Sequence, residues 1–372
     1  MMHLPIHKAE ILKSSDAYLI FICEEGGEKF VYKIAHENHG KLDKEVARIR
    51  ELAVTYPRLS VRLPIIHDHG TIESGPHAGK RYYVQSYFSG NTFSHHLQSS
   101  FTSASAVRDI FGTILRTLVD ISFEHVPNTV YDRRGGDFYR EAFMREFDRL
   151  RVLPNLSYLA SQEYVTINGE RYPSLRTLLD RIGTSSALAA LQERPSFIAS
   201  LGHWNFHGDN IIINDIQLSD RFKVIDPDVS IDENDPLYGI ARFLYSFPHD
   251  TAEYEQYLIH SPVFVHSPAI EPVYEIRSLW PEVVHRNYAG MFASVFATGD
   301  DGIAARDTRF ADPMTLVRLK LALLYCLVRG VNANYEETIE FIEGRMTEFR
   351  HKSTLLYLHA VLFADRLHRE LV

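Results

Sequence analysis

A lysine and a glutamate near the start of the chain have the surroundings of a buried ion pair. Lys33 lies in the apolar run Phe-Val-Tyr-Lys-Ile-Ala, and Glu45 shares one face of the next segment with Leu42 and Ile49. Burying either charge alone costs free energy, so an ion pair would satisfy both groups. It would also leave the ammonium aimed at phosphate oxygens. Each residue taken alone also fits a strand or helix face turned to solvent.

A carboxylate at the end of a strand is the second feature. In Val-Ile-Asp-Pro-Asp, residues 224–228, an apolar run ends at Asp226, and the proline that follows favours a turn. Mg²⁺ binds to one or two carboxylates together with substrate phosphates. Asp226 is therefore a candidate magnesium ligand, with a solvated acidic turn as the alternative.

The third feature is the polar segment HWNFHGDN, residues 203–210, which leads into three isoleucines. His203 and His207 are four residues apart, which is a zinc spacing on a helix. The residues between them do not predict a helix, and no third ligand is evident. A metal hydrolase built on His203, His207 and Asp209 is kept as an alternative that the sequence disfavours.

The elements that must position these residues change character near residue 90. Before it, β-rich runs at 17–25 and 28–35 flank a Gly-Gly turn, and a helix over 41–54 precedes a strand at 81–87. After it, helical patterns dominate, including the final segments 316–331 and 336–349. An Asn-Gly pair within 164–174 predicts a small hairpin or loop. The order predicts an α+β chain with a β-rich N-terminal lobe, 1–90, and a helical C-terminal lobe, 91–372.

The ordered set of strand lysine, helix glutamate, HWNFHGDN and IDPD resembles the aminoglycoside phosphotransferase and choline-kinase-like kinases, and is close to their streptomycin-kinase type. The segment NDPLYGIARFLYSF is similar to that family's G-D-P-x-Y-D-L-A segment. This resemblance implies a protein-kinase-like bilobal fold with ATP and Mg²⁺ as cofactors. It also implies a small-molecule acceptor, such as an aminoglycoside, amino sugar, sugar or amino alcohol, that is phosphorylated on a hydroxyl.

The same resemblance implies roles for single residues. Lys33 would contact the ATP phosphates and Glu45 would orient it, while Asn210 and Asp226 would hold Mg²⁺. Three consecutive residues would line the adenine through their backbone: Gln85, Ser86 and Tyr87.

Two further positions are implied outside this group. Asp235 would be a structural carboxylate that braces the catalytic loop, whereas Gly239 replaces the second aspartate of its segment. The loop over the phosphates would lie around Ser14 and Ser15, and it lacks glycine.

The resemblance places the family's catalytic aspartate on Asn205. An amide can accept a hydrogen bond but cannot take up a proton at ordinary pH. An alternative register makes Asp209 the base and Asn214 the metal ligand, but it puts the isoleucines 211–213 in an exposed loop, where a buried strand is expected. We favour the Asn205/Asn210 register, in which Asp209 could still supply a carboxylate. Base catalysis contributes about 10²–10⁴-fold, so a slow kinase and a nucleotide-binding pseudokinase are both retained.

Composition limits the classes of partner. The chain has 372 residues, 23% of them charged, and a formal net charge of -9. Proteins that bind nucleic acids or membrane surfaces usually carry basic patches, so neither partner is expected. Only two cysteines occur, with no metal or redox spacing, and no signal-peptide pattern is seen. We expect a cytoplasmic protein.

Overall fold

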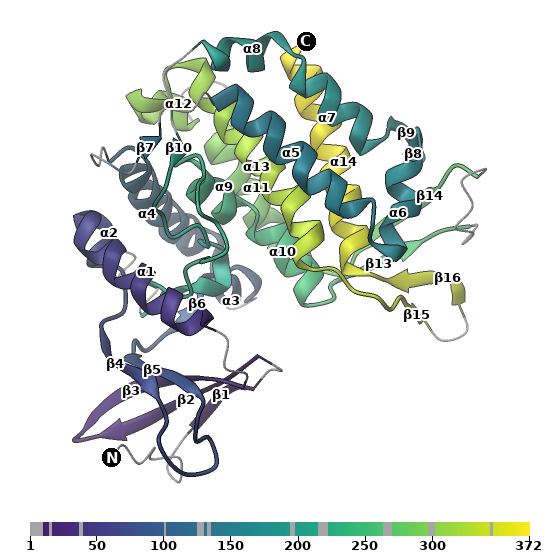
Figure 1. Ribbon diagram of the computed structural model, residues 1–372. Coiled ribbons are helices and arrows are strands. Elements are labelled where there is room, and N and C mark those ends of the chain that lie inside the picture. Colours follow the sequence, from purple (N-terminus) through teal and green to yellow (C-terminus); the bar gives the residue numbers. More distant parts are fainter. Residues whose placement is uncertain are drawn as a thin grey trace. The chain divides into compact units, whose positions relative to one another are not determined.

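The computed structural model describes residues 10–14, 17–36, 40–99, 102–124, 130–131, 135–193, 198–214, 222–262, 270–296, 302–342 and 345–372 (Figure 1). The chain forms two compact units. Unit 1 comprises 1–96, 109–129 and 200–234, and unit 2 comprises 97–108, 130–199 and 235–372. These units are defined by contacts within the chain, and their boundaries differ from those of the two lobes expected from the sequence. The lobe boundary near residue 90 therefore stays a prediction.

Unit 1 contains a five-stranded antiparallel sheet in the order β1-β2-β3-β5-β4. The turn between β2 and β3 uses Gly26 and Gly27, whose φ angles of 62° and 86° suit a type I′ hairpin turn. The strand bounds are β1 Glu10–Ser14, β2 Tyr18–Glu25, β3 Glu28–Ala35, β4 Ile66–Thr71 and β5 Arg81–Ser86.

One helix and a small second sheet complete the part of unit 1 that carries the polar residues. Helix α1, Lys41–Thr55, packs Leu42 and Val46 against Ala35 and Tyr83 of the large sheet. The second sheet has the order β12-β11-β6, formed by β6 Asn91–Thr92, β11 Ile211–Ile213 and β12 Phe222–Val224. Gly90 precedes β6 with φ 147°, and a Cβ there would collide with the backbone of Ile213, so only glycine allows this approach.

Further helices and one 3₁₀ turn connect these parts. They are α2 Pro57–Ser60, the 3₁₀ turn η2 Gly208–Asn210, and α3 Phe93–Gln98 and α4 Ala104–Ser122, which cross the divisions between the units.

Unit 2 is mainly helical. Its longest helices, α13 and α14, pack on each other, and α5 and α9 pack on α13. The described helices are α5 Gly135–Leu150, α6 Pro154–Ser161, α7 Leu175–Gly183, α8 Ser186–Gln192, α9 Tyr238–Leu244, α10 Ser246–Glu253, α11 Glu282–Phe296, α12 Ile303–Arg306, η3 Thr308–Phe310, α13 Pro313–Ala333 and α14 Lys352–Leu371. No helix among the described residues is both long and apolar enough to span a bilayer.

Unit 2 also carries a six-stranded sheet in the order β15-β16-β13-β14-β8-β9. The predicted Asn-Gly hairpin is present, because Asn168 and Gly169 turn the chain with φ 51° and 82°. The strands are β8 Tyr164–Ile167, β9 Glu170–Pro173, β13 Tyr257–His260, β14 Val273–Ser278, β15 Glu340–Ile342 and β16 Arg345–Arg350. A separate two-stranded pair joins β7 Val130–Tyr131 to β10 Ile198–Ala199.

The helix predicted over 336–349 is wrong. The chain there forms the hairpin β15–β16, and Phe349 pairs with Ile259 of β13 at a position that is only 1% exposed. Burial of Phe349 in the sheet outweighs the helical propensity of the many glutamates, which is a weak local preference.

Candidate functional site

Three charged side chains of unit 1 meet where a strand, a helix and a loop come together. The Lys33 Nζ atom, from β3, lies 2.8 Å from Glu45 Oε2 of α1 and 2.8 Å from Asp226 Oδ1, which follows β12. The side chains of Lys33 and Glu45 are 6% and 4% exposed, whereas that of Asp226 is 38% exposed. The ion pair expected between Lys33 and Glu45 is therefore present, and its outer side is a carboxylate that solvent can reach.

The electrostatics keep this cluster charged. Burial lowers the pKa of Lys33, but the phenol of Tyr83 and the two carboxylates outweigh it and hold the pKa well above its ordinary value. Burial raises the pKa of Asp226, yet the Lys33 ammonium outweighs it and leaves that pKa lowered. Burial raises the pKa of Glu45 despite the same ammonium. Asp226 therefore carries the firmer negative charge of the two carboxylates.

Two loops carry the polar residues and lie side by side. The N–H of Ile225 donates to the carbonyl of Asn210 at 3.0 Å, and that of Asp228 donates to the carbonyl of His203 at 2.9 Å. Trp204 and Asp226 have left-handed backbones, with φ 57° and 54°. Non-glycine residues pay about 1–2 kcal/mol for this conformation, and such strain gathers at functional sites.

The side-chain amide of Asn205 links these two loops, and that of Asn210 braces the first loop internally. The Nδ2 of Asn205 donates to the carbonyl oxygen of Asp226 at 2.7 Å. The Nδ2 of Asn210 donates to the backbone carbonyl of Asn205 at 3.2 Å. Asn205, Asn210 and Asp226 therefore belong to one hydrogen-bonded group. Lys33 of β3 joins this group through Asp226.

The alternative register has different surroundings. The isoleucines 211–213 form β11 between β6 and β12, as their β-branched side chains predict. Asn214 lies beyond this strand, where its Nδ2 donates to the carbonyl of Ser89 at 2.9 Å and to its hydroxyl at 2.7 Å. Asn210 and Asn214 are thus at opposite ends of β11, and Asn210 is the one connected to Asp226.

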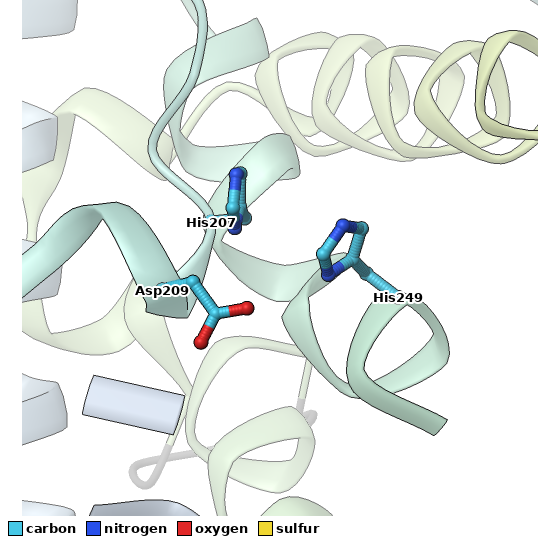
Figure 2. A group of neighbouring side chains, drawn as sticks. All are labelled: His207, Asp209 and His249. Atoms are coloured by element: carbon cyan, nitrogen blue, oxygen red, sulfur yellow. The ribbon is translucent and has the colours of Figure 1, made fainter. Parts of the chain in front are cut away.

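The two histidines of the segment have different environments. His203 is 1% exposed and stacks on Phe206 with ring centroids 4.6 Å apart. Burial lowers the pKa of His203 to about 3, so the ring is neutral. His207 and Asp209 lie at η2 with ligand atoms within 4.8 Å of each other, and Figure 2 shows both side chains on this loop. His249, also labelled there, belongs to α10 of unit 2.

These environments separate His203 from the other two residues of the disfavoured metal-hydrolase alternative. Among the residues that the structure describes, the grouping of potential metal ligands that contains His207 and Asp209 does not include His203. The stacked, buried ring of His203 has the surroundings of a core residue.

The predicted adenine segment lies at the end of β5. Gln85 pairs with Val31 on one side and Ile66 on the other, so its backbone is inside the sheet. The N–H of Ser86 donates to the carbonyl of Ile65 at 2.9 Å, and that of Tyr87 donates to the carbonyl of Lys29 at 3.3 Å. The backbone of Gln85 and the N–H groups of Ser86 and Tyr87 are therefore hydrogen-bonded within unit 1.

Sequence reasoning missed two anchors, Arg48 of α1 and Tyr56 directly after this helix, which both reach the segment just before HWNFHGDN. Arg48 donates from NH1 to the carbonyl of Gly202 at 3.0 Å and from NH2 to that of Ile231 at 3.4 Å. The hydroxyl of Tyr56 donates to the carbonyl of Leu201 at 2.8 Å. Their acceptors are backbone carbonyls far along the chain, which leave no mark in residue type or spacing.

Asp235 makes its ion pair inside unit 2. Its carboxylate receives two hydrogen bonds from Arg318 of α13, at 2.7 and 3.0 Å, and one from Tyr139 of α5 at 2.9 Å. The backbone N–H of Leu237 donates to it as well, at 2.9 Å. Arg318 lies next to Leu319 in α13, and this cation beside leucines was the available sequence signal for the partner of Asp235.

The loop expected over the phosphates lies mostly outside the described residues. Ser14 is the last residue of β1, and Ser15 is not among the residues that the structure describes. Gly239 lies inside α9 and is buried.

No protein-family model matches the chain, and no curated protein matches it by sequence. Two solved structures of a thermostable mutant of aminoglycoside phosphotransferase APH(4)-Ia are similar at 12% identity over 97% of this chain and 93% of theirs. One is a ternary complex with ADP and hygromycin B (TM-score 0.53), the other with AMP-PNP and hygromycin B (TM-score 0.52).

The chain is also similar to a third solved structure. It is a protein from Ralstonia eutropha described as an aminoglycoside phosphotransferase, with 11% identity over 97% of this chain and 91% of that one, and a TM-score of 0.50. At such low identity the similarity concerns the fold. The α+β, protein-kinase-like fold expected from the sequence is confirmed, and it is the fold of the aminoglycoside phosphotransferases.

Proposed function

We propose that this protein is an ATP-dependent phosphotransferase that transfers a phosphoryl group to a hydroxyl of a small polar acceptor. The observation that carries the proposal is the position of Lys33, whose ammonium lies 2.8 Å from both Glu45 and Asp226. An ammonium held by a buried glutamate beside a half-exposed aspartate is the arrangement with which kinases bind a nucleotide triphosphate and its metal. The shared fold with enzymes solved with ADP or AMP-PNP supports it.

The residues beside Lys33 suit magnesium. Asp226 offers a carboxylate with a lowered pKa and a solvent-accessible side chain. Asn210 donates through its Nδ2, which leaves the amide oxygen as the atom that would bind a metal. Carboxylate and amide oxygens are hard ligands that Mg²⁺ accepts. When bound there, Mg²⁺ would neutralise part of the phosphate charge.

The protein's own groups would act mainly by positioning and by charge. Lys33 would bind phosphate oxygens from its fixed position in β3, and Glu45 would keep the ammonium from turning away. Phosphoryl transfer through a loose transition state depends on these two effects more than on proton removal. Loss of a general base would therefore slow the reaction without abolishing it.

Asn205 determines how fast that reaction would be. Its Nδ2 donates to the carbonyl of Asp226, so its amide oxygen is the atom that could accept a hydrogen bond from the acceptor hydroxyl. It cannot take the proton, which would leave with solvent or phosphate. Asp209, in the neighbouring η2 turn, is the nearby carboxylate in sequence that could take it instead. We expect turnover about 10²–10⁴-fold below that of an enzyme with a carboxylate base.

The adenine would lie beyond the end of β5. Because the N–H groups of Ser86 and Tyr87 already donate within unit 1, the carbonyl groups of this segment and the residues after Tyr87 are the contacts we expect. A net charge of -9 fits a cationic or neutral acceptor better than a nucleic acid or an anionic membrane.

The direct test is ADP release from Mg-ATP in the presence of a panel of aminoglycosides, amino sugars, sugars and amino alcohols. We expect turnover with at least one acceptor and its loss in K33M. Binding of Mg-ATP without turnover on any acceptor would contradict the proposal and favour a nucleotide-binding pseudokinase.

The pseudokinase is a second candidate because of Asn205 alone. The variant N205D separates the two. A rise in turnover would show that the missing carboxylate limits a working enzyme. No turnover in N205D on any acceptor, with Mg-ATP still bound, would favour the binding protein. An aspartate cannot donate to the Asp226 carbonyl, so thermal stability must be measured alongside.

A further inference from the structure

A second lysine, Lys41, begins α1 one turn before Glu45. Lys41 and Glu45 are four residues apart in the helix, so their side chains lie on the same face. Glu45 points along this face to Lys33, with its Oε2 2.8 Å from the ammonium. Lys41 is therefore directed to the side of α1 that faces the charged cluster, although its side chain is exposed.

A single aromatic ring connects the two lysines. The ammonium of Lys33 lies 4.6 Å from the centroid of the Tyr18 ring, and the ammonium of Lys41 lies 5.4 Å from the same centroid. Tyr18 is the first residue of β2 and is half-buried. Cations are attracted to the face of an aromatic ring, so Tyr18 holds both ammonium groups near one point.

The charges around this point are balanced only while the site has no nucleotide. Lys33 and Lys41 are cationic, and Glu45 and Asp226 are the carboxylates beside them. Burial raises the pKa of Asp226, Lys33 lowers it, and Lys41 contributes a further lowering, which places Lys41 within electrostatic reach. A magnesium-bound triphosphate would add net negative charge.

Lys33 already has two carboxylate partners. Lys41, in contrast, forms no salt bridge with any residue in the part of the chain that the structure describes. Its exposed ammonium is therefore the cation of this cluster that can turn to a ligand without breaking a buried ion pair, which would be costly.

We propose that Lys41 is a second phosphate-binding residue, held by Tyr18 beside Lys33 and directed to the phosphates of the nucleotide. This inference rests on the proposed function, because it names a further contact to the same ATP. The contact is charge-assisted, and it strengthens with the number of phosphates that the nucleotide carries.

The test is calorimetric binding of Mg-ATP, Mg-ADP, AMP and adenosine to the full chain and to K41Q. We expect the affinity for Mg-ATP to fall roughly 3- to 20-fold, because a partly exposed charged contact is lost. The loss should be smaller for Mg-ADP and absent for adenosine. The control is K44Q, because Lys44 is an exposed lysine of the same helix, three residues further on. It should bind every nucleotide as the wild type does.

Tyr18 provides a second variant with its own control. Y18F keeps the ring and should retain affinity for Mg-ATP, whereas Y18L removes it and should lose part of the affinity that K41Q loses. In the double variant Y18L/K41Q the two losses should not add, because both remove the same contact.

Several results would overturn the inference. Wild-type affinity for Mg-ATP in K41Q would do so, as would an equal loss in K44Q or an equal loss for adenosine. Failure of the proposed function is distinguishable because it appears in the wild type, which then either does not bind Mg-ATP or binds it without turnover of any acceptor. Because Lys41 is exposed, we expect K41Q to unfold at the same temperature as the wild type, and thermal unfolding checks this.

Discussion

Unit 1 has a buried lysine beside an aspartate, and unit 2 has a buried arginine beside an aspartate. The two ion pairs differ in what surrounds them. In unit 2 the side chains of Arg318 and Asp235 are 7% and 0% exposed, and the carboxylate also accepts hydrogen bonds from the Tyr139 hydroxyl and the Leu237 N–H. In unit 1 Lys33 is shared between a buried Glu45 and an Asp226 whose side chain is 38% exposed. The first pair is closed, and the second is open on one side.

The difference shows how the same chemistry serves two purposes. A closed ion pair with a bidentate arginine fixes helices in one arrangement, and removing one partner leaves a buried charge. An open pair keeps an ammonium in place while a carboxylate stays accessible to a ligand. The aspartate of the open pair also has a strained, left-handed backbone, with φ 54° at Asp226.

The largest effect is expected when the closed pair is broken. R318M leaves the Asp235 carboxylate buried without its cation, so the free energy of unfolding should fall by about 3–5 kcal/mol. Denaturant unfolding measures this. The control is R176M, which removes the exposed pair with Asp180 and should cost less than about 1 kcal/mol. Equal losses in the two variants would mean that the unit 2 pair is not a closed structural one.

The second effect concerns activity at the open pair. K33M should reduce turnover by roughly 10²–10³-fold, the range for losing one preorganised donor aimed at developing charge. The protein should remain folded, because Asp226 is partly solvated and the raised pKa of Glu45 lets that group become neutral. ADP release and thermal unfolding measure the two quantities, with K44M as the control. Full turnover in K33M would rule out the assigned role of Lys33.

The third effect is a pH dependence of stability in unit 1. The pKa of His203 is about 3 in the folded protein because of burial, below the ordinary value of about 6.5. Between these two pH values the unfolded chain binds a proton at this histidine more readily than the folded protein does. The free energy of unfolding is therefore highest above pH 6.5 and falls as the pH decreases.

From pH 7 to pH 5 the wild type should therefore lose ~2 kcal/mol more than H203L does. Urea unfolding at both pH values gives this difference. H69L, at an exposed histidine of β4, should behave like the wild type. The same pH dependence in H203L as in the wild type would show that the buried ring is not its source.

The smallest effect tests an anchor of the open pair. R48A removes the two hydrogen bonds from α1 to the carbonyls of Gly202 and Ile231. Because Arg48 fixes α1, the helix that carries Glu45, through these two carbonyls, we expect kcat to fall about 3- to 10-fold while KM for ATP stays nearly constant. R48K should recover part of the loss, and R50A, at an exposed position of α1, should have no effect. A change in KM alone would indicate a binding role instead.

Features of the site that depend on nearby residues followed from the sequence. Lys33 in an apolar strand and Glu45 on the inner face of a helix predicted their ion pair, and three isoleucines predicted β11. The hairpin at Asn168-Gly169 followed in the same way. In the final seventy residues the same kind of reasoning failed, because the helical pattern over 336–349 gave way to pairing of Phe349 with β13.

The sequence by itself determined local features: which segments are strands or helices, where turns need glycine, and which charges lie on buried faces. Propensity, periodicity and the cost of burying a charge act over a few residues, so they can be read along the chain. Only the tertiary structure decided that Asp226 reaches Lys33 across 193 positions, that Arg48 donates to the carbonyl of Gly202, and that Asp235 pairs with Arg318. Such partners are selected by packing among many candidates of the same chemical type, and no spacing in the sequence distinguishes them.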